Sequence, residues 1–208
     1  MRAAGVLLAC AALLLPAPAR AQSADRALLY TAIWGSLASY GLALFHREQF
    51  QCRARPGYEA QVLADRELTA FAAGLAFVDC EAPRWAGPLG LRFDPLLLGA
   101  HWTAREGDGA SFAWELAALP RLQHVLPLGP VRLDLQLAVG PAFLSEPEVG
   151  TRRKSTRLQF SDEVGVGLSD RAGRLRVGWL FRHLSNAGLA QPNNRVDFYG
   201  VSLDVRWP

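Results

Sequence analysis

Residues 131–140 read Val-Arg-Leu-Asp-Leu-Gln-Leu-Ala-Val-Gly. The odd-numbered positions of this stretch are all Val or Leu, whereas the even-numbered positions are charged, polar or small. Because successive side chains of a β-strand point to opposite faces, the alternation predicts a strand with one apolar face and one polar or small face. The stretch therefore favours a β-sheet protein.

The same alternation recurs along the chain from about residue 58 onward. It predicts eight strands, at residues 58–65, 68–80, 88–103, 111–123, 130–143, 156–168, 173–186 and 195–207. The expected connectors alternate between short ones, as at 127–130 and 169–173, and longer ones, as at 145–155 and 186–194. Short periplasmic turns and long outer loops are typical of outer-membrane barrels, so the end of the strand near residue 185 is expected on the outer side.

Two features favour a membrane barrel over a soluble one. The segments are about ten residues or longer, which is the length that crosses a bilayer at a tilt. Their polar faces mix charged residues with Gly and Ala, as the crowded interior of a small barrel requires. We therefore expect an all-β fold, an eight-stranded antiparallel outer-membrane β-barrel over residues 58–208 with an N-terminal extension over 22–57. A soluble barrel, whose strands would also alternate, is the alternative.

The first residues indicate export. Arg2 precedes an apolar segment at residues 6–15, and Ala19-Arg20-Ala21 provides a small-x-small cleavage site. We expect residues 1–21 to be a signal peptide on this three-part pattern. The uncharged run at residues 27–45 is rather polar for a transmembrane helix, so we assign it to the extension, as a helix or an extra strand pair.

Charge and cysteine content exclude some classes of function. Of the 22 Lys and Arg residues, Arg2 and Arg20 would leave with the signal peptide, so 20 would face 19 acidic residues. No basic run is interleaved with aromatic residues, which argues against nucleic-acid binding. Cys52 and Cys80 form an even pair that an oxidising compartment would bridge, the alternative being two free thiols. Neither cysteine has partners at metal-ligand spacing, so no metal site is expected.

A serine and a histidine stand two residues apart near the end of one expected strand. His183 and Ser185 therefore point to the same face, where a base can lie close enough to take the proton of a nucleophilic hydroxyl. That face is the apolar one, because it also carries Phe181. On the next strand Asp197 shares the apolar face with Tyr199. Ionisable side chains facing lipid indicate function, the alternative being that they mark the membrane interface.

The segment around this pair resembles a known family. Residues 183–194 read His-Leu-Ser-Asn-Ala-Gly-Leu-Ala-Gln-Pro-Asn-Asn, which resembles the active-site segment of the lipid A 3-O-deacylases (PagL family). Residues 158–168, Leu-Gln-Phe-Ser-Asp-Glu-Val-Gly-Val-Gly-Leu, resemble the preceding strand of that family. The similarity is clear over 131–207 and diffuse from 58 to there. It implies an outer-membrane enzyme of Gram-negative type that hydrolyses the ester-linked 3-O-acyl chain of lipid A without a cofactor.

The resemblance also implies roles for individual residues. Ser185 would be the nucleophile, His183 its general base and Asp197 the acid that orients the imidazole, while Asn193 would help to stabilise the oxyanion. The family usually has Glu where this chain has Asp197. Because the acid mainly fixes the tautomer and orientation of the histidine, an Asp can serve there.

Basic residues cluster in the expected outer loop before the active-site strands: Arg152, Arg153, Lys154 and Arg157. They are candidate contacts for lipid A phosphates, because guanidinium groups bind phosphate in a bidentate manner. The alternative is a set of solvated loop charges. The expected partners are lipid A or lipopolysaccharide and the outer membrane, with a homodimer left open. The alternative functions are a non-catalytic barrel with a structural or adhesion role, and a periplasmic esterase with a soluble fold.

Overall fold

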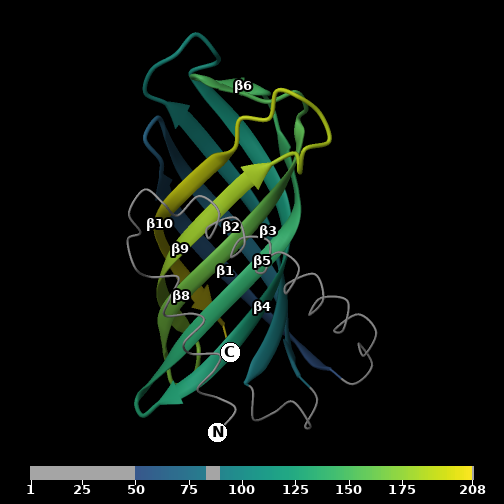
Figure 1. Cartoon of the computed structure of the whole chain (residues 1–208). Helices are drawn as coiled ribbons and strands as arrows, with labels where there is room; N and C mark the ends of the chain where they lie inside the picture. The colour runs from purple at the N-terminus through teal and green to yellow at the C-terminus, as the bar shows by residue number, and fades with distance from the viewer. Residues whose placement is uncertain (1–49, 83–89, 208) are drawn as a thin grey trace, which may run out of the picture. The chain divides into compact units, whose positions relative to one another are not determined.

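A computed structural model describes residues 50–82 and 90–207. Eight long antiparallel strands close into a barrel in the order β1-β10-β9-β8-β5-β4-β3-β2 (Figure 1). The barrel strands are β1 (Gln51–Ala64), β2 (Leu68–Glu81), β3 (Leu91–Ala104), β4 (Phe112–Leu128), β5 (Val131–Leu144), β8 (Leu158–Asp170), β9 (Leu175–Ser185) and β10 (Val196–Arg206). A separate two-stranded sheet pairs β6 (Glu148–Val149) with β7 (Arg152–Arg153) in the loop between β5 and β8. The predicted eight-stranded barrel is confirmed.

The first strand begins earlier than the sequence predicted. β1 starts at Gln51 and not at residue 58, because its first residues pair with the end of β2. Cys52 lies directly opposite Cys80, and the two form the expected disulfide. Pro56 falls at a shift in the β1–β2 register, where a bulge tolerates proline and interrupts the alternation that reveals a strand.

The expected signal peptide at residues 1–21 and most of the expected extension at 22–57 lie outside the described residues. Within the described part of the chain, no helix is long and apolar enough to cross a membrane.

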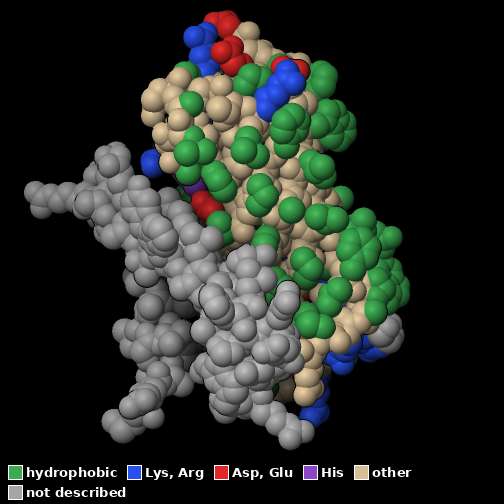
Figure 2. All heavy atoms as spheres, turned by 90° about the vertical axis from the view of Figure 1, so that its right-hand side faces the viewer, with side chains coloured by type: hydrophobic (Ala, Val, Ile, Leu, Met, Phe, Trp, Pro, Cys, Tyr) green, Lys and Arg blue, Asp and Glu red, His purple; other side chains and the backbone are tan. Residues whose placement is uncertain are grey.

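The apolar faces of the strands point outward. On β9, Val177 and Trp179 are exposed, while Arg176 and Arg182 are buried inside the barrel. Figure 2 shows hydrophobic side chains spread over one flank of the barrel and most charged side chains toward its ends. An apolar exterior with a polar interior is the reverse of a soluble barrel and the pattern of an outer-membrane barrel.

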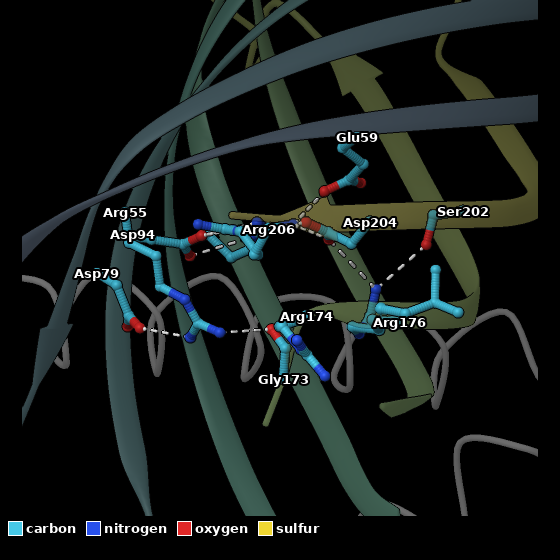
Figure 3. A network of polar contacts seen from close by, with 12 residues as sticks. Arg55, Glu59, Asp79, Asp94, Gly173, Arg174, Arg176, Ser202, Asp204 and Arg206 are labelled. Atoms are coloured by element: carbon cyan, nitrogen blue, oxygen red, sulfur yellow. Dashed lines mark hydrogen bonds and ion pairs between the residues drawn. The ribbon is translucent and has the colours of Figure 1, made fainter. Parts of the chain in front are cut away.

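The interior holds the strands in register through buried ion pairs. Near the end of the barrel where β10 finishes, Arg121 Nη2 donates to Asp94 Oδ2 at 2.7 Å, and Arg121 Nη1 donates to Asp204 Oδ2 at 3.2 Å. Arg206 also pairs with Asp94, and Arg176 lies beside Asp204 (Figure 3). A buried charge is tolerated only when it is paired, so this network favours one arrangement of the strands.

At the opposite end, large apolar side chains join the polar ones in the interior. The rings of Trp102 and Phe198 meet edge to face with centroids 5.1 Å apart, and Leu184 is fully buried. Leu184 and Phe198 face inward, so their chain neighbours His183 and Asp197 must face outward. The packed interior therefore fixes the strands that carry the candidate residues.

Candidate active site

The register of three neighbouring strands brings the candidate residues together. His183 on β9 lies directly opposite Asp197 on β10 and opposite Asp162 on β8. Ser185 is the last residue of β9 and shares the outward side of that strand with His183. The cluster lies at the end of the barrel that carries the longer connections, after β9 and around β6 and β7 (Figure 1).

Histidine and aspartate are in direct contact. The Nδ1 atom of His183 lies 2.6 Å from Asp197 Oδ1, and the second carboxylate oxygen lies 3.3 Å from Arg195 Nε. His183 is buried, whereas the Asp197 side chain is 33% exposed. With Nδ1 engaged by the carboxylate, Nε2 is the ring nitrogen left to accept a proton from a hydroxyl.

The serine hydroxyl lies where a backbone amide approaches it. Ala187 N–H donates to Ser185 Oγ at 3.4 Å, a long hydrogen bond. Among the described residues, no hydrogen bond joins Ser185 Oγ to His183. Nucleophile and base are commonly further apart in the absence of substrate, so their shared strand face is the relevant geometric feature.

A tight turn follows the serine. Ala187 and Gly188 both have positive φ, at 54° and 79°, and Leu189 N–H donates to Asn186 O at 3.1 Å. Two positive φ values in succession define a type I′ turn, a conformation that costs an alanine about 1 kcal/mol. The fully buried side-chain amide of Asn186 offsets this cost. Its Nδ2 donates to Ser155 Oγ and Ala190 O, and its Oδ1 accepts a hydrogen bond from Gly188 N–H. Sequence reasoning missed Asn186, although the Asn-Ala-Gly string is a turn signal.

Asn193 lies across this turn. Its Oδ1 accepts a hydrogen bond from Asn186 N–H at 3.1 Å, which places its side-chain amide beside the residue that follows Ser185. In the described part of the chain, its Nδ2 group has no hydrogen-bond partner. Asn193 Nδ2 is thus an available donor near the residue that follows Ser185, and such a donor can stabilise an oxyanion.

The four basic residues predicted as phosphate contacts differ in their surroundings. Arg152 pairs with Asp65 at 3.0 Å and Glu67 at 3.2 Å in the β1–β2 turn, while the side chains of Arg153 and Arg157 are exposed.

Lys154 is buried, and its ammonium donates to two backbone carbonyls. Burial and the neighbouring Arg152 lower the pKa of Lys154 to about 8. The surface of the loop therefore offers Arg153 and Arg157, but not Lys154, to a ligand.

Asp162 was not predicted. It lies on the outward face of β8, opposite His183 and on the side away from Asp197, so the imidazole stands between two carboxylates. Its position among the apolar residues Phe160 and Val164 is the signal that could have identified it. Over residues 50–82 and 90–207, no group of three or more His, Cys, Asp or Glu side chains is arranged to hold a metal ion.

Fold and site together define a class of protein. An outer-membrane-type barrel with outward-facing Ser185, His183 and Asp197 near one rim is a membrane barrel with a polar side-chain cluster on its lipid-facing surface. A family model, Lipid A 3-O-deacylase (PagL), matches residues 73–206. The chain belongs to this family.

Individual relatives agree with the family model. The lipid A deacylase PagL of Pseudomonas aeruginosa is 30% identical over 99 residues, 48% of this chain and 57% of that protein. The lipid A deacylase PagL of Bordetella bronchiseptica is 25% identical over 117 residues, 56% of this chain and 64% of that protein. The chain thus spans about three-fifths of the length of these curated relatives.

A solved structure has the same fold. The crystal structure of the outer membrane enzyme PagL superposes with a TM-score of 0.60 at 23% sequence identity. The match covers 73% of this chain and 99% of that chain.

Proposed function

We propose that this protein is an outer-membrane esterase that removes the ester-linked 3-O-acyl chain of lipid A by a Ser–His–acid mechanism. The observation that carries the proposal is the 2.6 Å contact between His183 Nδ1 and Asp197 Oδ1, beside Ser185 on the lipid-facing side of the barrel. Ionised or nucleophilic side chains on such a surface indicate a functional site, because polar groups facing hydrocarbon are energetically unfavourable. Family membership supports the same reaction.

The proposed reaction is acyl transfer in two halves. Ser185 Oγ attacks the ester carbonyl while its proton passes to His183 Nε2, and the negative charge on the carbonyl oxygen is stabilised by Asn193 Nδ2. The tetrahedral intermediate collapses, and the 3-hydroxyl of lipid A leaves with the proton from His183. Water, deprotonated by His183, then attacks the acyl-serine ester and releases the fatty acid and the free serine.

Substrate placement follows from the position of the site. Acyl chains in the outer leaflet of the membrane lie against the outward face on which Ser185 stands, so lipid A can reach the serine from within the bilayer. The exposed Arg153 and Arg157 lie in the loop above this face and would contact the lipid A phosphates. Export would use residues 1–21 as a signal peptide.

The experiment that tests the proposal is mass spectrometry of lipid A from cells that express the protein. Expression should remove one ester-linked hydroxyacyl chain, and Ser185→Ala should restore the intact lipid A. Ser169→Ala is the matched control, because it removes a buried hydroxyl from β8 at the end of that strand that lies away from Ser185. The amount of folded barrel in each strain should be measured from the gel mobility of samples that have not been heated. Continued deacylation by Ser185→Ala would contradict the mechanism, and intact lipid A with the folded parent protein would favour a non-catalytic barrel.

A further inference from the structure

The side chain of Lys154 joins two parts of the candidate site. Its Nζ donates to Leu184 O at 3.2 Å and to Asn194 O at 2.9 Å, and only 4% of the residue is exposed. Leu184 immediately precedes Ser185, and Asn194 immediately follows Asn193. One ammonium group therefore contacts both the strand of the serine and the loop of the oxyanion donor.

This contact acts where the barrel ladder has ended. The last pair between β9 and β10 is Leu184 with Val196, and Ser185 still pairs with Phe160 of β8, so residues 186–195 depend on other contacts for their position. Two of these are backbone hydrogen bonds, from Ser155 N to Pro192 O at 2.8 Å and from Asn194 N to Arg153 O at 3.1 Å. The bonds from Lys154 are charge-assisted, and such bonds are roughly twice as strong as neutral ones.

The residue type at this position is unusual for the chain. Lys154 is the single lysine in the sequence, and the remaining 21 of its 22 basic residues are arginines. An ammonium is compact, and unlike a guanidinium it changes protonation readily when it is buried. The two carbonyl acceptors suit the small ammonium group, and its charge depends on pH.

We propose that Lys154 is a positioning residue for deacylation, whose ammonium holds the loop of Asn193 at a fixed distance from Ser185. The inference rests on the proposed function for its catalytic readout, and on the two hydrogen bonds for its structural readout. Lys154 itself does not touch the reacting atoms.

A pH dependence follows from the surroundings of the ammonium. Burial and Arg152 lower the pKa of Lys154 to about 8, against the opposing charges of Glu115 and Asp197. Above this pH the amine is neutral and its two hydrogen bonds weaken, so the deacylation rate should fall.

The stability of the fold should respond in the opposite direction. An unfolded lysine has a pKa of 10.5, so between about pH 8 and 10.5 the unfolded chain binds more protons than the folded one. The contribution of this group to the free energy of unfolding therefore rises with pH. If the deacylation rate falls at alkaline pH while the free energy of unfolding does not, Lys154 has a positioning role and not a merely structural one.

The test compares kcat and KM of purified full-length variants on lipid A in mixed micelles from pH 6.5 to 9.5, with Ser185→Ala as the blank. Lys154→Met should lower kcat about 10- to 100-fold at pH 7 with KM changed less than about two-fold, because small displacements of catalytic groups reduce rates to this extent. Lys154→Arg should abolish the fall in kcat above about pH 8, which is the alkaline limb of the pH–rate profile, because arginine stays charged. Arg66→Met, which removes an exposed charge from the β1–β2 turn, should behave as the parent. Parental kcat in Lys154→Met, or an unchanged alkaline limb in Lys154→Arg, would overturn the proposal.

A second measurement does not depend on catalysis. Amide hydrogen exchange over residues 186–195 should be about ten-fold faster in Lys154→Met than in the parent, and protein made with ¹³C-labelled lysine should show one side-chain signal that titrates near pH 8. If Ser185→Ala deacylates as fast as the parent, the proposed function fails, but the exchange result still decides the role of Lys154. Unchanged exchange would overturn the positioning role, and faster exchange would support it.

Discussion

Replacement of Asp197 tests the contact on which the proposed mechanism most depends. In Asp197→Ala, His183 Nδ1 loses a carboxylate partner at 2.6 Å, and with it the group that fixes its tautomer and stabilises its positive charge. Loss of the buried acid in serine proteases reduces kcat about 10⁴-fold, or about 5 kcal/mol. The Asp197 side chain is 33% exposed, so water can replace part of its effect. We therefore expect kcat to fall about 10²- to 10³-fold, or about 3–4 kcal/mol.

The assay is the steady-state rate of purified protein on lipid A in mixed micelles. The loss should fall on kcat with KM little changed, because Asp197 contacts the histidine and not the substrate. Asp197→Glu should retain activity within about ten-fold, since it restores the carboxylate that the family usually carries there. Arg195→Gln is the control. An ion pair with an exposed arginine is weak, so the loss of this partner of Asp197 should change kcat less than about three-fold. If Asp197→Ala keeps its kcat within about three-fold of the parent, Asp197 is not the acid of the mechanism.

Three further predictions concern other parts of the molecule. Asn193→Asp keeps the acceptor for Asn186 N–H but loses the Nδ2 donor, so kcat should fall about 10²-fold while the loop stays ordered; an unchanged kcat would remove Asn193 from the oxyanion site. Replacing both Arg153 and Arg157 by Gln should raise KM for lipid A severalfold but not for an ester without phosphates, and an equal rise for both substrates would refute phosphate contact. Replacing Cys52 and Cys80 by Ala should lower the free energy of unfolding in urea by about 3–4 kcal/mol, for a bridge across 28 residues, without changing kcat; loss of activity in the folded variant would contradict the separation of the bridge from the site.

The barrel could be predicted from sequence because its physical signal is repeated. Alternation such as that at residues 131–140 recurs along most of the long strands, and each recurrence places apolar side chains on the outer face. The start of β1 could not be predicted in the same way. Pro56 and the charged residues before it interrupt the alternation, and only the pairing of Cys52 with Cys80 extends the strand to Gln51.

The site could be predicted only in part. Strand parity, meaning whether a residue has an odd or an even position along its strand, gives the face of the sheet on which it lies but not its contacts. Parity placed His183, Ser185 and Asp197 on the outer face, and the register then brought the histidine and the aspartate into contact. Local sequence gave no means to separate Lys154 from its neighbours Arg152 and Arg153. The direction of each of these side chains depends on the loop contacts around β6 and β7, which join residues far apart in the chain.

The proposed mechanism makes Ser185 the nucleophile of a lipid A esterase. The most direct measurement is the deacylation rate of purified Ser185→Ala against the parent, on lipid A in mixed micelles at pH 7, with folding of both verified. We expect a loss of at least about 10³-fold, because the hydroxyl that forms the acyl intermediate is absent. A Ser185→Ala rate within about ten-fold of an active parent would show that Ser185 is not the nucleophile.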